Sequence, residues 1–437
     1  MTDTDALDRI IDRCFRVLVF LLPLHTVYLD AWVAWKPWLI LLVLVAAMSL
    51  LTGRGWPWNA QASAALAVFV GAVLVSWPGT AAPPTFWRLV LALAAGGLLF
   101  LVTARRAVDI ESLLRVVFWS GAAMAATGLI FGLITNGVFG APLVEAINDL
   151  PGVDRVNKIA YVEGFVALTN WHQDPGYSAL WTNVWFVLAG QAWLRGIVTG
   201  PRWLGALVLG GLASATVLTL SRTGWIGLLV AVAALSLSRR GDWRRTAKVL
   251  GGAALAATLI LTAMFLSDPE GVGNDMETSV LFRLVNLVVL GQIEVDEEDV
   301  VPGLDPGDNR LEVWPLYWER FVGSPVRGTG LGTGWAEQGT QEPHNLWLQL
   351  AAETGLLGLL GFGVVLGVCW RLAGRPGEVV TPALAVVGVA TLTQTVLFEP
   401  VLWFVLGLWA ARTKSTRRSH HGQHDEVPDQ DESVVDR

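Results

Sequence analysis

The sequence predicts an all-α polytopic membrane protein with about twelve transmembrane helices. The chain has 437 residues, of which 53% are hydrophobic and 15% are charged. Its repeated apolar runs of roughly 18–22 residues are long enough to cross a hydrocarbon core of about 30 Å. Basic residues gather in every second loop between these runs, as expected when such loops face the cytoplasm. Length, composition and charge distribution thus agree on one fold class.

The predicted spans follow one another along the whole chain. They are centred on residues 15–29, 38–51, 63–77, 87–103, 113–134, 177–194, 204–220, 225–237, 249–265, 354–370, 382–396 and 402–411. Residues 1–12 are polar and acidic, and we expect them to form a cytoplasmic N-terminus. No small-residue cleavage site follows the first apolar run, which favours a retained helix over a signal peptide.

The basic loops predict the orientation of the chain. With a cytoplasmic N-terminus, the inner loops and the tail hold Arg54, Arg105, Arg106, Arg115, Arg195, Arg202, Arg239, Arg240, Arg244, Arg245, Lys248, Arg371, Arg375, Arg412, Lys414, Arg417 and Arg418. The alternate loops are mostly not basic. Both termini are therefore predicted on the cytoplasmic side of the cytoplasmic (inner) membrane.

Two long polar segments then lie outside. The first covers residues 136–176, within the region 13–267 that carries the first nine spans. The second, residues 268–343, is a large extracytoplasmic loop with 15 Asp or Glu against four Arg. Its run 294–299 is predicted to be solvated, with a cation site as the weaker alternative. Residues 344–412 hold an outer helix start and the last three spans, and 413–437 form a polar tail predicted to be disordered.

His344 stands where the long outer loop meets the tenth span. Pro343 suits the first turn of a helix, because no backbone N–H is missed there. This would place His344 at a helix N-terminus, where the dipole favours a neutral imidazole and attracts anions. Such a histidine could take a proton from a hydroxyl near neutral pH. The alternative is an interfacial histidine that caps a transmembrane helix.

Three arginines are candidates to bind a phosphate or diphosphate on the outer side. Arg222 follows Ser221, a plausible N-cap, and a guanidinium beside a helix N-terminus suits such an anion. Arg310 and Arg88 also stand at the starts of predicted helices, on the outer side. The alternative for each is an arginine that snorkels and anchors the interface.

The end of the outer loop contains a short predicted helix and a glycine-rich segment. Trp314 and Trp318 share one helical face with Leu311 and Phe321. The glycines that follow, at 328, 330, 332 and 334, suggest a loop whose backbone makes close approaches. This loop has no P-loop lysine and no preceding strand, so nucleotide binding is a poor interpretation.

Further polar residues lie near the predicted outer face. His172 and Asp174 end the first outer loop and suit a sugar, with a catalytic His172 as the weaker alternative. Glu399, before the last span, is a candidate lining residue. Glu353 follows His344 by nine residues, about 13 Å along an unbroken helix and on its opposite face. Unless the helix breaks near Gly355, Glu353 is expected to orient a neighbouring segment or pair with an arginine.

These elements together resemble the O-antigen ligase and O-antigen polymerase superfamily of bacterial surface-polysaccharide proteins. The motif elements are Ser221-Arg222 with Gly224, Arg310 with Trp314 and Trp318 before the glycine-rich segment, and His344-Asn345 followed by Glu353, Gly355 and Gly358. The likeness covers most of the chain by topology, and by motif residues 221 to 362.

The resemblance implies a glycosyltransferase-type enzyme that acts on the extracytoplasmic face. Its donor would be a glycan on undecaprenyl diphosphate, and the acceptor a hydroxyl of a glycan, lipid or other molecule. It implies inversion at the anomeric carbon and no metal, nucleotide sugar or other cofactor. Membrane lipids would surround the enzyme, and nucleic acid is not expected as a partner.

The same resemblance implies roles for individual residues. His344 is the candidate catalytic base, and Arg222 and Arg310, with Arg88, are the candidate diphosphate-binding groups. The supporting or sugar-binding candidates are Ser221, Asn345, Glu353, Trp314, Trp318, His172, Asp174 and Glu399.

Other functions remain open at this point. A ligase would attach a finished polymer to an acceptor, whereas a polymerase would join lipid-linked repeat units. A transporter or flippase of lipid-linked glycans should carry charges or broken helices deep in its spans. Here the spans hold few ionisable groups and the polar features gather on one face. A non-catalytic assembly subunit is the last alternative.

Overall fold

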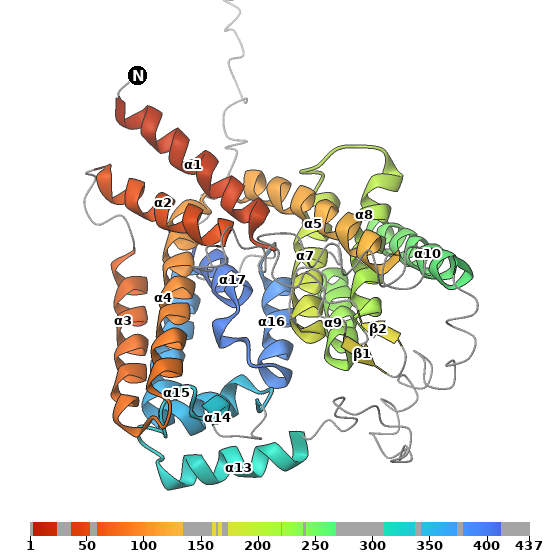
Figure 1. Cartoon of the computed structure of the whole chain (residues 1–437). Helices are drawn as coiled ribbons and strands as arrows, with labels where there is room; N and C mark the ends of the chain where they lie inside the picture. Colours follow the sequence, from red (N-terminus) through yellow and green to blue (C-terminus); the bar gives the residue numbers. More distant parts are fainter. Residues whose placement is uncertain are drawn as a thin grey trace, which may run out of the picture.

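The computed structural model describes residues 3–23, 36–52, 59–133, 160–162, 165–167, 174–219, 221–238, 242–267, 310–336, 342–373 and 379–411. These parts are almost wholly helical (Figure 1). One short antiparallel hairpin departs from the all-α prediction. Its strands β1 (Ala160–Val162) and β2 (Phe165–Ala167) pair with Ala160 opposite Ala167, inside the first predicted outer loop.

A helix lies at each of the twelve predicted spans. The helices are α1 (Asp3–Leu21), α2 (Pro37–Leu51), α3 (Ala60–Val75), η1 (Trp77–Gly79), α4 (Pro83–Arg106), α5 (Ile110–Leu133), α7 (Pro175–Leu194), α8 (Arg202–Leu218), α9 (Arg222–Ser238), α10 (Trp243–Ser267), α13 (Arg310–Gly323), α14 (Thr333–Ala336), α15 (Leu346–Ala373), α16 (Thr381–Thr393), η5 (Val396–Phe398) and α17 (Pro400–Ala410). The helix α1 begins at Asp3, within the segment predicted as a polar terminus.

Length and composition separate these helices into two groups. Among the described residues, five helices are long and apolar enough to cross a membrane: α3 with η1, α4, α5, α10 and α15. Five further apolar helices are shorter, namely α2, α8, α9, α16 and α17. The chain is thus a multi-pass membrane protein, and a count of twelve crossings stays a prediction.

Two helices form the centre of the bundle. In α7 and α17 nearly every residue is buried, and the rings of Trp181, Trp185 and Trp403 are fully enclosed. These two helices therefore pack against other parts of the chain on all sides. The peripheral helices instead turn large apolar side chains outward: Leu360 of α15 is 66% exposed and Leu255 of α10 is 62% exposed. These outward faces suit surrounding lipid.

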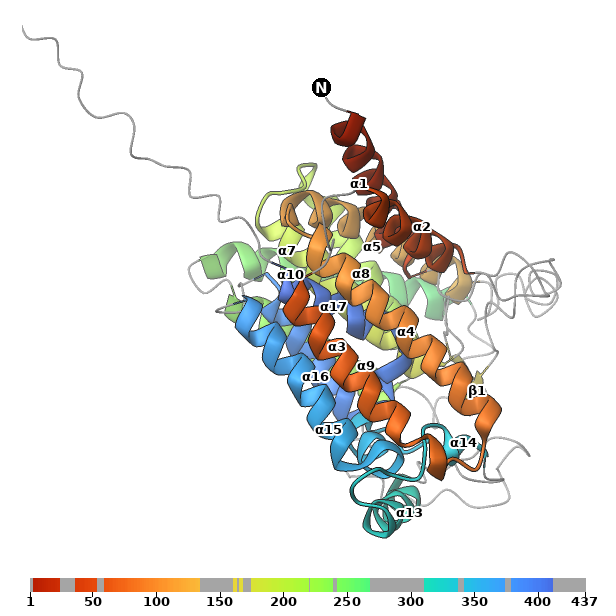
Figure 2. The ribbon, with the colours of Figure 1, turned by 90° about the vertical axis from the view of Figure 1, so that its left-hand side faces the viewer.

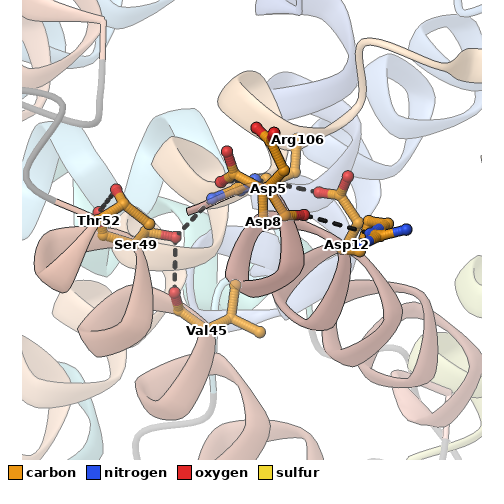
Figure 3. A network of polar contacts seen from close by, with 8 residues as sticks. Asp5, Asp8, Asp12, Val45, Ser49, Thr52 and Arg106 are labelled. Atoms are coloured by element: carbon orange, nitrogen blue, oxygen red, sulfur yellow. Dashed lines mark hydrogen bonds and ion pairs between the residues drawn. The ribbon is translucent and has the colours of Figure 1, made fainter. Parts of the chain in front are cut away.

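The helix α4 runs from one end of the bundle to the other. Its start lies beside α14 and its last residue, Arg106, lies beside α1 and α2 (Figures 1 and 2). Arg106 Nη1 lies 3.1 Å from an Asp12 oxygen and 3.5 Å from an Asp8 oxygen. Its Nη2 donates to Ser49 Oγ at 3.1 Å (Figure 3). One arginine therefore ties α1 and α2 to α4.

A cleft of about 570 Å³ opens at this end, lined by Arg106 and by residues such as Arg16, Thr52, Arg105 and Glu111. Two further basic residues bind backbone carbonyls at the same end: Arg115 donates to Ile197 O at 3.4 Å and Arg245 to Trp193 O at 3.2 Å. The residues predicted to face the cytoplasm thus gather away from the start of α4.

The contacts of Arg106 predict that its side chain stabilises the folded protein. In Arg106→Met the two aspartates lose their partner, and we expect a destabilisation of about 1–3 kcal/mol, as is typical of hydrogen bonds to charged groups. Thermal unfolding in detergent would measure it as a lower Tm. The control is Arg105→Met, since Arg105 is exposed. Equal effects of the two variants would contradict the assignment.

Candidate functional site

The tenth predicted span is broken at Gly355, inside α15. Gly355 has φ 64° and ψ −164°, so the helical hydrogen bonds stop on both sides of it. The carbonyl of Ala352 accepts the N–H of Thr329 at 3.0 Å, and that of Glu353 accepts the N–H of Gly330 at 2.9 Å. Backbone groups that the break frees are therefore satisfied by the glycine-rich loop.

The second half of α15 is held by the same loop. The N–H groups of Leu356 and Leu357 donate to Pro325 O at 2.8 Å and Val326 O at 3.1 Å. A Cβ on Gly328 would lie 2.3 Å from the backbone of Glu353. The prediction that the alternating glycines make close backbone approaches is confirmed, and α13, which precedes the loop, is thereby fixed to α15.

Glu353 braces this loop from inside the bundle. Its side chain is 0% exposed. One carboxylate oxygen accepts the N–H of Gly334 at 3.3 Å, and the other accepts Gln349 Nε2 at 3.2 Å. The charge of Arg320 on α13 lies nearby. The Glu353 side chain thus contacts the glycine-rich loop and its own helix.

His344 lies one residue before the N-cap of α15. The helix begins at Leu346, and Asn345 caps it by accepting the N–H of Leu348 at 3.0 Å. His344 has φ 45°, which is uncommon for a residue with a side chain. The prediction that Pro343 occupies the first turn is wrong, because an asparagine two residues later is the stronger cap.

The segment before α15 is anchored by tryptophan. The Pro343 carbonyl accepts the indole N–H of Trp314 on α13 at 2.8 Å. Trp347, in the first turn of α15, donates its own indole N–H to Thr391 Oγ1 on α16 at 3.1 Å. His344 is therefore held between α13 and α16.

A chain of hydrogen bonds links His344 to the Ser221-Arg222 motif. His344 Nδ1 lies 3.3 Å from Gln394 Oε1, and Gln394 Nε2 donates to Thr223 Oγ1 at 3.2 Å. Thr223 Oγ1 lies 2.9 Å from Ser221 Oγ. Ser221 Oγ accepts the Gly224 N–H at 3.2 Å and so caps α9, as predicted. Elements distant in sequence thus meet at one end of the bundle.

The motif glycine lets α9 approach α7 closely. A Cβ on Gly224 would lie 2.4 Å from Ala179 Cβ, and the Gly224 carbonyl accepts Asn183 Nδ2 at 2.8 Å. Arg222, the first residue of α9, is half-buried beside Ser221. Arg222 and the first N–H groups of α9 therefore belong to the same helix end.

Acidic residues gather around the start of α7. Asp174 caps this helix by accepting the N–H groups of Gly176 and Tyr177 at 2.7 and 3.0 Å. The Tyr177 hydroxyl lies 3.3 Å from Glu342 Oε2. Burial, with the carboxylates of Asp174 and Glu399 nearby, raises the pKa of Glu342 to about 7. Glu342 therefore takes up a proton near neutral pH.

Glu399 occupies the turn before α17, as predicted. One of its oxygens accepts the indole N–H of Trp181 on α7 at 3.0 Å. The adjacent turn is held by the Tyr177 hydroxyl, which donates to the Thr395 carbonyl at 3.1 Å. In the described part of the chain, no group of three His, Cys, Asp or Glu side chains is arranged to hold a metal ion.

Other candidates lie apart from this network or beyond the described residues. Trp318 is 56% exposed and packs on Phe321. Arg88 is exposed on the first turns of α4, which contact the glycine-rich loop. Arg310 begins α13 as expected, but its side chain lies outside the described residues, as does all of His172. The run 294–299 and the tail 413–437 also lie outside them.

No functional role was predicted from the sequence for Gln394, Thr223, Tyr177 or Glu342. One signal was available for Gln394, because a polar side chain near the end of an apolar span is costly unless it has a partner. Thr223 stands inside the motif formed by Ser221, Arg222 and Gly224, which indicated its neighbourhood but not its contact. The contacts of Tyr177 and Glu342 join residues 165 positions apart, which no local pattern shows.

The comparisons with known proteins support the resemblance on the part of the chain that carries the motifs. The family model described as O-antigen ligase matches residues 206–363. This match contains all the elements from Ser221 to Gly358, whereas α1–α7, α16 and α17 lie outside it. No curated protein matches the chain. The part of the chain from residue 206 to 363 is thus similar to the O-antigen ligase family, within a chain whose apolar helices are those of a multi-pass membrane protein.

The break in α15 predicts a sharp difference between two glycines of one helix. In Gly355→Ala, a Cβ would meet the Val326 carbonyl oxygen at 2.4 Å, in a backbone conformation (φ 64°, ψ −164°) that is almost restricted to glycine and costs other residues about 1–3 kcal/mol. We expect a clearly lower Tm in detergent. Gly363→Ala is the control, because nothing lies within 4 Å of a Cβ there. A wild-type Tm for Gly355→Ala would refute the broken helix.

The raised pKa of Glu342 predicts a pH dependence of stability. The folded state holds the Glu342 proton more tightly than the unfolded state, so this stabilisation is full below about pH 4.5 and is lost as the pH rises through about 7. Relative to Glu342→Gln, the wild-type Tm should therefore fall between these pH values. Glu319→Gln, at an exposed position of α13, serves as the control and should follow the wild type.

Proposed function

Because residues 206–363 match the O-antigen ligase family, we propose that the protein is a membrane glycan transferase. It moves an oligo- or polysaccharide from undecaprenyl diphosphate to an acceptor hydroxyl, with inversion at the anomeric carbon. The observation that carries this proposal is the hydrogen-bond chain from His344 through Gln394 and Thr223 to Ser221, since it brings the candidate base to the helix start that bears Arg222.

In the proposed reaction His344 acts as the general base. Its neutral imidazole takes the proton of the acceptor hydroxyl while the hydroxyl oxygen attacks the anomeric carbon. The bond from that carbon to the diphosphate oxygen breaks, and both bonding electrons leave with the diphosphate. The products are the glycosylated acceptor, protonated His344 and free undecaprenyl diphosphate, so atoms and charge balance.

The leaving diphosphate gains negative charge as the bond breaks. Arg222 stands at the N-terminus of α9, where a guanidinium and the helix dipole both favour that charge. Arg310, which begins α13, and Arg88 on α4 are the further cations proposed to bind the diphosphate. Groups placed in advance at the position where charge develops lower the barrier most.

The carboxyl groups around Tyr177 do not conflict with an anionic donor. Asp174 is engaged with the first N–H groups of α7, and Glu399 with the Trp181 indole. Glu342, whose pKa is about 7, carries only part of a negative charge at neutral pH. We propose that these groups bind sugar hydroxyls of the donor or acceptor.

The proposed site faces the extracytoplasmic side. The supporting argument is the separation of charges along the bundle, because the basic residues predicted to be cytoplasmic gather at the Arg106 end. His344 and Arg222 lie at the opposite end, next to the start of α7 and the end of α16. Both termini are accordingly proposed to be cytoplasmic, in the inner membrane.

The experiment uses purified protein in nanodiscs with a short undecaprenyl-diphosphate oligosaccharide, with and without an acceptor, and with EDTA. Transfer that requires the added acceptor supports a ligase. Longer chains on the lipid diphosphate would identify a polymerase instead. Absence of any product with every donor tried would overturn the enzymatic proposal and favour transport.

Two substitutions test the assigned roles. His344→Ala should lower the transfer rate about 10²–10⁴-fold, the usual contribution of a positioned base. Arg222→Ala should lower it about 10²–10³-fold, as expected when one charge-stabilising group is removed. Both should still insert and fold, as shown by size-exclusion chromatography. Arg327→Ala, at an exposed loop position, is the control and should keep wild-type activity.

A further inference from the structure

Gln394 occupies an unusual place for an amide side chain. It is the C-cap of α16, where the apolar helix ends, and only 4% of its surface is exposed. Its backbone N–H donates to the Ala390 carbonyl at 2.8 Å, which fixes the start of the side chain. It lies outside residues 206–363, the part of the chain that matches the family. A buried amide at such a position needs partners for both of its ends.

Both ends of this amide have partners at the candidate site. The oxygen Oε1 lies 3.3 Å from His344 Nδ1, and Nε2 donates to Thr223 Oγ1 at 3.2 Å. The start of α7 packs directly against the amide, since a Cβ on Gly176 would lie 2.2 Å from Gln394 Nε2. The amide plane is therefore held by contacts from three different segments.

An amide oxygen can only accept a hydrogen bond. An imidazole nitrogen that faces it must therefore carry the hydrogen, and in a neutral ring the basic lone pair is then on the other nitrogen. We propose that Gln394 is a positioning residue that holds His344 as the Nδ1–H tautomer and so makes Nε2 the atom that accepts the acceptor's proton. This inference rests on the proposed role of His344 as base.

The second bond of Gln394 joins the other end of its amide to Thr223. With Nε2 directed to the Thr223 hydroxyl, Oε1 is directed to the imidazole. Thr223 in turn pairs with Ser221, which caps α9 next to Arg222. The orientation of the base is thus coupled to the helix start that is proposed to bind the diphosphate.

Several charged or titratable groups lie on the elements around His344. They are Glu342 in its own segment, Asp174 and Tyr177 on α7, Arg222 on α9, Glu399 before α17, and Arg310, Glu312, Glu319 and Arg320 on α13. All of these remain in variants of Gln394. A change of pH behaviour in such variants therefore reports on the amide itself.

The direct test is nuclear magnetic resonance of full-length protein labelled with ¹⁵N-histidine, with His344→Gln to assign the signals. The expected result is a neutral His344 that is protonated on Nδ1 in the wild type and becomes a mixture of tautomers in Gln394→Ala. A wild-type ring protonated on Nε2, or an unchanged tautomer in Gln394→Ala, would overturn the inference. This readout does not depend on enzymatic activity.

The kinetic test uses Gln394→Glu and Gln394→Ala. A carboxylate facing the Nδ1–H stabilises the imidazolium, so Gln394→Glu should move the acidic limb of the kcat/KM profile to higher pH by about one unit or more. Gln394→Ala should lower kcat about 10–100-fold, as is typical when the orienting partner of a functional histidine is removed, with little change in KM.

The control is Thr393→Val, one residue away, because the Thr393 hydroxyl donates within α16, to Val389 O at 3.2 Å. Thr393→Val should keep the wild-type pH profile. An unmoved pH profile in Gln394→Glu would refute the positioning role while leaving the proposed base in place. Full activity in His344→Gln would instead refute the proposed function. The tautomer measurement would still test whether Gln394 holds the His344 ring as the Nδ1–H tautomer.

Discussion

The interruption of α15 at Gly355 is the constraint on which the candidate site depends. Gly355, with its positive φ, leaves backbone donors and acceptors of α15 without helical partners at this end of an apolar bundle. The glycine-rich loop supplies those partners by pairing with Ala352, Glu353, Leu356 and Leu357, and the buried Glu353 carboxylate holds the loop from inside. The loop fixes α13, and α13 holds the segment of His344 through Trp314.

Indole N–H groups connect the rest of this end of the bundle. Trp314 binds the Pro343 carbonyl, Trp347 binds Thr391, Trp181 binds Glu399, and Trp403 binds the Leu397 carbonyl at 2.8 Å. Each ring fills apolar space, while its single donor points to one defined acceptor. These four tryptophans thus combine apolar packing with a directed hydrogen bond at this end of the bundle.

Much of the fold could be predicted from the sequence because its signals are local. Apolar runs predicted the helices, Ser221 predicted the cap of α9, and alternating glycines predicted close backbone approaches. The start of α15 was predicted wrongly, because the preference of proline for a first turn was given more weight than the capping preference of Asn345. Gln394 was missed for a different reason. Its partners are 50 and 171 residues away, and no periodic pattern encodes such a contact.

The bond between Gln394 and Thr223 also has a consequence for biosynthesis. Thr223 leaves the ribosome long before Gln394, since 171 positions separate them. During that interval the helices from α9 to α15 can enter the bilayer while the histidine still lacks its amide partner. The proposed site would therefore be complete only when α16, which carries Gln394 at its end, packs against α7 and α9.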